Sequence, residues 1–186
     1  GGKTAQLASA GAEVTALDIS ADRMERVRAN LSRLHLDAEI VVADALKYTP
    51  GPVFDAVLLD APCSATGTFR RHPEVLLHRN AEGIAERVTL QRKMLAHAAS
   101  LLKPGGRLVY CVCSLETAEG EDQIGWVQKA LPDLELVPVD ADELDGWGTP
   151  LTPEGAVRLT PAMTLPGNIA GGLDGFFIAR FVKKPA

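Results

Sequence analysis

Two short segments carry cysteines beside polar residues, at points where apolar stretches of the chain end. The first reads Asp60-Ala61-Pro62-Cys63-Ser64 and the second Tyr110-Cys111-Val112-Cys113-Ser114. A thiolate is a strong nucleophile, and an unperturbed thiol has a pKa of about 8.5, so nearby positive charge assists it. Two cysteines at the ends of adjacent strands, with an acid beside one of them, suit attack on an electron-poor ring carbon.

The start of the chain and two later acids have the arrangement of a nucleoside-binding site. Gly1 and Gly2 precede an expected helix, and the N-terminus of a helix binds anions through its backbone N–H groups. Asp18 follows the next expected strand, where an acid accepts hydrogen bonds from ribose hydroxyls. Asp44 follows the strand after that and can accept from an adenine amino group. The alternative is that the glycines form a plain turn and that both acids cap the helices after them.

Basic residues cluster between the two cysteine segments. Against Glu74, Glu82 and Glu86, this stretch holds six cations: Arg70, Arg71, Arg79, Arg87, Arg92 and Lys93. The whole chain has a net charge of -5, so any nucleic-acid contact must be local, and we expect Arg70 and Arg71 to contact RNA phosphates. A solvated helix and loop face is the alternative interpretation of the same cluster.

Strands and helices must alternate to bring these residues together. The apolar run 54–59 lacks alternation, which is typical of a parallel strand buried on both faces, and spacing and capping signals predict the other elements. Helices are expected at 4–10, from Ser20 to Leu34, from about 84 to a stop at 103–106 and at 121–130, and strands at 13–17, 39–42, 54–59, 107–112, 134–137 and 176–182. The middle of the C-terminal third reads as irregular.

This order predicts an α/β fold with a mostly parallel sheet and helices on both faces, and with ligands at the carboxyl ends of the strands. Asp18, Asp44 and Asp60 are all expected at that edge. A doubly wound domain opens with a strand before its Gly-rich loop. We therefore expect the first strand to be missing and the chain to be N-terminally incomplete.

Bulk properties limit the remaining choices. A chain of 186 residues with 46% hydrophobic residues fits a single domain spanning 1–186. No apolar run approaches the roughly 20 residues of a membrane span, and a signal peptide is absent, so we expect a cytoplasmic protein without membrane contact. Three cysteines predict free thiols rather than a disulfide framework. We expect Cys111 to be a packed small residue that strand alternation turns away from Cys113.

Together the segments resemble the Sun/RsmB family (NOL/NOP/Sun type) of S-adenosylmethionine-dependent RNA (cytosine-5) methyltransferases, over nearly the whole chain. The matching positions are Gly1-Gly2-Lys3-Thr4, Asp18, Asp44, Asp60 to Cys63, Tyr110 to Ser114, Glu119 to Glu121, and Asp174 to Phe177. The chain departs from the family at Ala65, where Gly is frequent, and at Val112, where Thr is usual. The resemblance implies a Rossmann-like class I methyltransferase fold with an antiparallel C-terminal strand. It also implies S-adenosyl-L-methionine as cofactor, bound by Gly1, Gly2, Lys3, Asp18, Asp44 and Asp60.

The resemblance further implies that the two motif cysteines divide the reaction between them. Cys113 would attack C6 of cytosine, Asp60 would hydrogen-bond or protonate the ring near N3, and Cys63 would assist release of the covalent adduct. Cytosine-5 DNA methyltransferases use the cysteine of the Pro-Cys pair as nucleophile, so Cys63 in that role stays an alternative. The expected substrate is RNA, rRNA before tRNA, with no metal site and no obligate protein partner.

Two other classes of protein stay open at this point. Gly2-Lys3-Thr4 can end the phosphate loop of a P-loop nucleoside triphosphatase, with 54–60 as its second motif strand. Such an enzyme has no need for Cys63 and Cys113. A non-catalytic RNA-binding module with a methyltransferase-like fold is the other alternative, although every expected reactive side chain is present.

Overall fold

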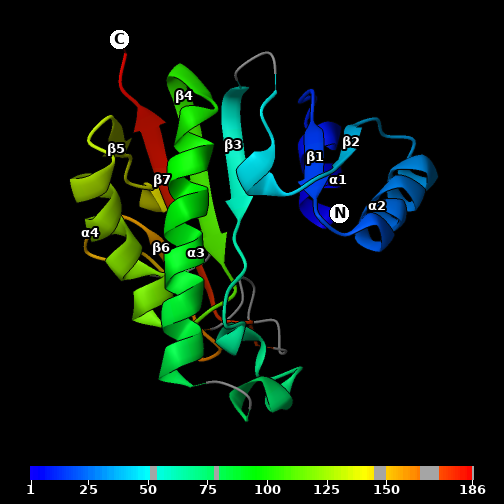
Figure 1. Cartoon of the computed structure of the whole chain (residues 1–186). Coiled ribbons are helices and arrows are strands. Elements are labelled where there is room, and N and C mark those ends of the chain that lie inside the picture. The colour runs from blue at the N-terminus through cyan, green and yellow to red at the C-terminus, as the bar shows by residue number, and fades with distance from the viewer. Residues whose placement is uncertain (51–53, 78–79, 145–149, 164–171, 186) are drawn as a thin grey trace. The chain divides into compact units, whose positions relative to one another are not determined.

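The computed structural model describes residues 1–50, 54–77, 80–144, 150–163 and 172–185. The chain forms two compact units, residues 1–50 and residues 51–186 (Figure 1). The first unit contains elements α1 to β2, and the second contains β3 to β7.

The first unit pairs two short parallel strands with two helices. Strand β1 (Thr15–Asp18) lies in register with β2 (Glu39–Val42), and the helices are α1 (Gly2–Ser9) and α2 (Ala21–Leu34). The expected cap is confirmed, since the Ser20 side chain accepts a hydrogen bond from the backbone N–H of Arg23. The core of the unit consists of Ala16, Met24, Val27 and Leu31.

The second unit is built on a five-stranded sheet in the order β3-β4-β7-β5, with β6 also paired to β7. Strands β3 (Phe54–Asp60) and β4 (Leu102–Val112) are parallel, whereas β7 (Phe176–Lys183) runs antiparallel to β4. The antiparallel C-terminal strand is thus confirmed. On its other edge β7 pairs with β5 (Leu134–Leu136) near its end and with β6 (Val157–Leu159) near its start.

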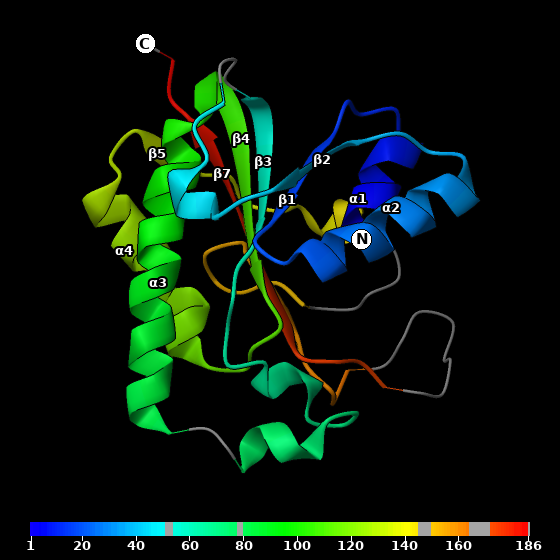
Figure 2. The same cartoon turned by 45° about the vertical axis from the view of Figure 1, so that its right-hand side comes forward.

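Two helices cover one face of this second sheet. Helix α3 (Ala81–Ser100) and helix α4 (Glu121–Ala130) lie on the same side of the strands in both views (Figures 1 and 2). Their apolar residues pack against the strands in one core, whose fully buried members include Leu95, Leu108, Tyr110, Val112, Val127, Phe177 and Phe181. The short 3-10 helices are η1 (Ala45–Lys47), η2 (Thr66–Thr68), η3 (Pro73–Leu76), η4 (Thr117–Glu119) and η5 (Ala141–Leu144).

The structure corrects the sequence prediction around residues 100–106 and 157–159. Helix α3 ends at Ser100, and 102–106 belong to β4, because the Phe54 backbone N–H donates to the carbonyl of Leu101 and Phe54 pairs with Leu102. Strand β6 lies in the stretch that the sequence marked as irregular. Three residues are too few to establish an alternating pattern, and only the pairing with β7 makes this segment a strand.

Candidate active site

The two cysteine segments come together after the ends of β3 and β4. The Sγ atoms of Cys63 and Cys113 are 3.5 Å apart, and both are free thiols that are partly exposed. The parallel register of the strands produces this meeting, because Asp60 is the partner of Cys111 and the next backbone N–H, that of Ala61, donates to the Cys111 carbonyl. The two thiols that the sequence analysis singled out therefore lie side by side.

The third cysteine has a contact that the sequence analysis missed. Cys111 is 2% exposed, and its Sγ donates a hydrogen bond to Asp60 Oδ1 at 3.6 Å. Its burial was expected, but the argument from alternation was wrong, because residues two apart along a strand face the same side of the sheet. Cys111 thus lies against the acid that the sequence assigns to base activation.

A buried carboxylate holds the chain just after Cys63. Glu119 is 0% exposed, and it accepts hydrogen bonds from the Ser64 backbone N–H at 2.9 and 3.1 Å and from the Ser64 hydroxyl at 2.5 Å. The side-chain amide of Gln91, on α3, donates to Glu119 Oε1 at 3.0 Å and also to the Pro62 carbonyl at 3.0 Å. Both backbone groups that flank Cys63 are therefore hydrogen-bonded to this pair.

Three buried hydroxyls connect this pair to the segment around Cys113. Ser64 Oγ lies 3.0 Å from Ser114 Oγ and 3.3 Å from Thr66 Oγ1. Ser114 Oγ accepts from the backbone N–H of Glu116, and Thr66 Oγ1 accepts from that of Leu115. Residues beside the two thiols thus share one hydrogen-bonded network.

Arg158, on β6, fixes the Cys113 segment from another direction. Its guanidinium donates to the Ser114 carbonyl at 2.5 Å, forms an ion pair with Glu121, and lies 4.8 Å from the centre of the Phe177 ring. No periodicity or motif in the sequence marked Arg158, because its strand is too short to be recognised.

Gly67 allows the backbone of three segments to meet next to Cys113. Its N–H donates to the Cys113 carbonyl at 3.0 Å, and its carbonyl accepts from the N–H of Gly175 at 2.7 Å. A Cβ atom at position 67 would lie 2.0 Å from the Gly175 oxygen and 2.9 Å from the Cys113 oxygen. Only glycine fits this close approach.

The surroundings of the thiols favour an uncharged Cys63. Its pKa is raised far above the ordinary value by its hydrogen bond to Cys113, by burial, and by the nearby charges of Cys113 and Glu119. Since two neighbouring thiolates repel each other, one of the pair stays protonated. Burial and the nearby Glu119 thus favour the protonated form of Cys63, and the hydrogen bond between the two sulfurs can run in either direction.

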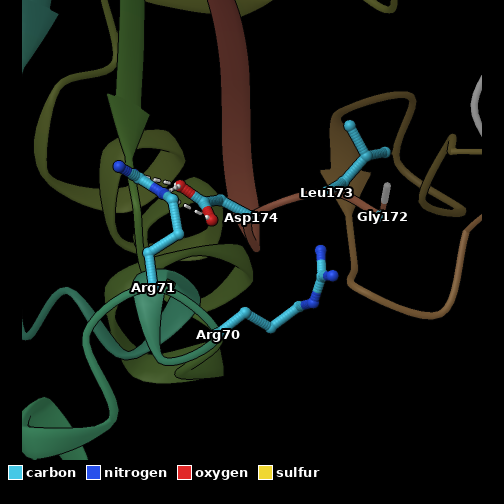
Figure 3. Close-up of a pocket in the computed structure, with 5 residues that line it drawn as sticks. All are labelled: Arg70, Arg71, Gly172, Leu173 and Asp174. Atoms are coloured by element: carbon cyan, nitrogen blue, oxygen red, sulfur yellow. Dashed lines mark hydrogen bonds and ion pairs between the residues drawn. The ribbon is translucent and has the colours of Figure 1, made fainter. Parts of the chain in front are cut away.

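Arg70 and Arg71 line an open pocket of about 360 Å³ together with Gly172, Leu173 and Asp174 (Figure 3). The Arg71 guanidinium forms an ion pair with Asp174, with Nε donating to Oδ2 at 3.0 Å. This contact lowers the pKa of the Asp174 carboxyl. Arg70 extends along the other side of the pocket toward Gly172, as Figure 3 shows. The two arginines expected to contact phosphate therefore share one pocket, and one of them is ion-paired.

The expected cofactor residues of the first unit retain hydrogen-bonding capacity. Asp18 Oδ1 accepts from the Ser20 N–H at 2.8 Å and pairs with Arg23 at 2.9 Å, whereas its other oxygen has no hydrogen-bond partner within residues 1–50. Asp44 caps η1 through the Leu46 N–H at 3.0 Å, so the capping role proposed as its alternative is real. A Cβ at Gly2 would meet no atom within 4 Å. Space beside Gly2 and an acid with one oxygen unbonded within residues 1–50 fit a nucleoside-type cofactor.

Neither a metal cluster nor a membrane-spanning helix occurs in the part of the chain that the structure describes. No group of three or more His, Cys, Asp and Glu side chains there could hold a metal ion. No helix there has both the length and the apolar character needed to cross a membrane.

Sequence reasoning missed Gln91 and the role of Glu119. Gln91 is a polar residue three positions after Val88 and four before Leu95, on the apolar face of α3, and that placement could have marked it as a buried hydrogen-bonding group. Glu119 belongs to the second cysteine motif, but nothing local indicates that its carboxylate returns to Ser64.

Comparisons with known proteins agree on one family. The family model for 16S rRNA methyltransferase RsmB/F matches residues 1–182. Ribosomal RNA small subunit methyltransferase B of Xylella fastidiosa (strain 9a5c) is 40% identical, over 99% of this chain and 42% of that protein. The protein of the same name from Vibrio cholerae is 39% identical, over 99% of this chain and 39% of its own length.

A solved structure has the same fold. The crystal structure of NSun6 from Pyrococcus horikoshii with SFG has a TM-score of 0.79 and 27% identity, covering 100% of this chain and 46% of that one. The chain spans about two fifths of the length of the curated relatives it matches.

Proposed function

The chain belongs to the RsmB/F family of 16S rRNA methyltransferases, and on that premise we propose that it is the catalytic domain of an S-adenosylmethionine-dependent RNA (cytosine-5) methyltransferase. The observation that carries this proposal is the pair of thiols, Cys63 and Cys113, held 3.5 Å apart after the end of β3 at Asp60. Membership of this methyltransferase family excludes the alternative that the chain is a P-loop nucleoside triphosphatase.

Cys113 is the nucleophile of the proposed reaction. Its sulfur forms a bond to C6 of the target cytosine, which makes C5 nucleophilic, and Asp60 donates a hydrogen bond or a proton near N3 to stabilise the charge that develops on the ring. S-Adenosylmethionine, when bound, supplies the electrophilic methyl group that C5 receives. The raised pKa of Cys63 supports this division, since a thiol that stays protonated is a poor nucleophile.

Cys63 acts in the second half of the cycle. Once C5 carries the methyl group, a base such as water accepts the C5 proton, the C5–H electron pair forms the C5=C6 double bond, and Cys113 leaves C6 as a thiolate. We assign assistance in this release to Cys63, whose Sγ lies beside that of Cys113. The target base must leave its stack to reach the thiols.

The remaining residues bind the two substrates. Gly1, Gly2 and Lys3 hold the methionine end of the cofactor, Asp18 its ribose and Asp44 its adenine, and Asp60 is the further cofactor residue that the resemblance implies. Arg70 and Arg71 contact RNA phosphates beside the catalytic pair. We propose rRNA as the substrate ahead of tRNA, one catalytic domain over 1–186, action in the cytoplasm, and no obligate protein partner.

The experiment is a trapping assay in the full-length protein with a cytosine-containing RNA and S-adenosylmethionine. Cys63→Ala should form a protein-RNA adduct that survives denaturing electrophoresis, because it can attack and methylate but not let go. Cys113→Ala and the double variant should form none, and Asp60→Ala should form little while staying folded. An adduct in Cys113→Ala but not in Cys63→Ala would reverse the two roles, with Cys63 as nucleophile. RNA binding without methyl transfer in the wild-type protein would instead favour a non-catalytic module.

A further inference from the structure

The backbone on both sides of Cys63 is held by one pair of side chains. Gln91 donates to the Pro62 carbonyl at 3.0 Å, and Glu119 accepts from the Ser64 N–H at 2.9 and 3.1 Å. Cys63 is the residue between these two anchored groups. Its position therefore depends directly on where Gln91 and Glu119 lie.

The Gln91–Glu119 pair is itself rigidly placed. Its two side chains are joined at 3.0 Å, and both residues are 0% exposed. Gln91 stands in the middle of the long helix α3, and the Glu119 carbonyl accepts from the buried Tyr110 hydroxyl at 2.7 Å. The pair thus connects the loop that carries Cys63 to α3 and β4 through hydrogen bonds.

The same carboxylate also reaches the Cys113 side of the site. Ser64 Oγ donates to Glu119 and lies 3.0 Å from Ser114 Oγ, and Ser114 directly follows Cys113. Within the described residues, the groups that contact the Glu119 carboxylate are amide and hydroxyl donors, and none of them is a cation. Burying this carboxylate therefore costs free energy that an ion pair would partly offset. An apolar residue would fill this space at lower cost, but it could not hold the two cysteine segments in register.

We propose that Glu119 and Gln91 are positioning residues that hold Cys63 at Cys113 for release of the methylated base. This inference rests on the function proposed above, in which Cys113 attacks and Cys63 releases. A displaced Cys63 leaves attack and methyl transfer possible but slows the breaking of the bond between Cys113 and C6. The pair therefore acts on the second half of the cycle.

Glu119→Gln tests the inference with almost no change in shape. Its carboxamide keeps one acceptor oxygen and places an NH₂ group at the position of the other, so Ser64 and Gln91 lose part of the acceptor set that holds them. Turnover should fall on the order of 10- to 100-fold, because misplacement of a reacting group by about 1 Å has that effect. Single-turnover methyl transfer should stay within about threefold of wild type, and the denaturation-resistant adduct should accumulate as in Cys63→Ala.

Two further variants support the comparison. Glu116→Gln makes the same chemical change three residues earlier, where the backbone N–H but not the carboxylate contacts Ser114, and it should turn over like wild type. Gln91→Leu removes the bond to the Pro62 carbonyl and keeps Glu119, so it should also accumulate adduct. It serves as the test if Glu119→Gln does not fold.

The outcomes separate this inference from the function on which it rests. Adduct in Cys63→Ala together with wild-type turnover in Glu119→Gln and Gln91→Leu would overturn the positioning role alone. Equal losses of single-turnover transfer and turnover, with a lowered melting temperature, would also overturn it, since they indicate a general structural role. Absence of adduct in Cys63→Ala would overturn both proposals.

Discussion

Gly67→Ala adds one methyl group and is expected to destabilise the folded chain strongly. The added methyl group would lie 2.0 Å from the Gly175 oxygen and 2.9 Å from the Cys113 oxygen. Both neighbours are backbone atoms, so no side chain can rotate away to make room. The loop at Gly67 must instead separate both from Gly175, just before β7, and from the residue that we propose as nucleophile.

The size of the effect follows from what is lost. Separation breaks the bonds from Gly67 N–H to the Cys113 carbonyl and from Gly175 N–H to the Gly67 carbonyl. At about 1 kcal/mol for each bond, plus about 1 to 3 kcal/mol for overpacking, the variant should lose roughly 3 to 5 kcal/mol. At roughly 3 °C for each kcal/mol, this lowers the melting temperature on the order of 10 °C.

Thermal unfolding followed by calorimetry measures this change, and Gly125→Ala is the matched control. Gly125 lies in α4, and a Cβ there would meet no atom within 4 Å, so alanine should raise the melting temperature through its better helix propensity. Both the melting temperature and the rate of methyl transfer should fall in Gly67→Ala, and neither should fall in Gly125→Ala. An unchanged melting temperature and unchanged methyl transfer in Gly67→Ala would refute the argument from close backbone approach.

Three more predictions follow from the structure. In the full-length protein, Asp18→Ala should weaken S-adenosylmethionine binding by on the order of tenfold or more, since a hydrogen bond to a charged group contributes about 1.5 to 3 kcal/mol; calorimetry that finds equal affinity removes Asp18 from the site. Replacing Arg70 and Arg71 by alanine should lower the slope of log affinity against log salt by roughly 1 to 2, at about 0.7 for each contact to single-stranded RNA, and an unchanged slope makes this a solvated face. The pKa of Glu143 is lowered to about 2 by its hydrogen bonds from Arg180. Because the folded-state pKa is lowered, ionised Glu143 stabilises the protein above about pH 4.3, and this stabilisation is lost as the pH falls toward 2. Glu143→Gln should therefore make the melting temperature depend less on pH in that window. A pH profile of the melting temperature parallel to that of the wild type would contradict this prediction.

Much of the fold could be predicted because its signals are local. Helix α2 begins where Ser20 predicts a cap and keeps its apolar residues at helical spacing, and β3 covers the predicted stretch 54–59. The expected burial of β3 on both faces is wrong, because Leu59 is the one buried residue of this strand. The meeting of Cys63 and Cys113 also follows from local signals, since parallel neighbouring strands place their carboxyl ends together. The exact start of β4 and the existence of β6 could not be predicted, because both depend on partners far along the chain.

The amino-acid sequence alone determined which chemical groups this protein has and roughly which strand ends carry them. Only the tertiary structure decided that Glu119 accepts from Ser64, 55 residues away, that Gln91 joins the pair from α3, and that Cys111 touches Asp60. Hydrogen bonds between such distant residues leave no periodicity in the sequence. They form only when strand register and helix packing bring a donor to an acceptor, and a buried polar side chain shows its role only in its final surroundings.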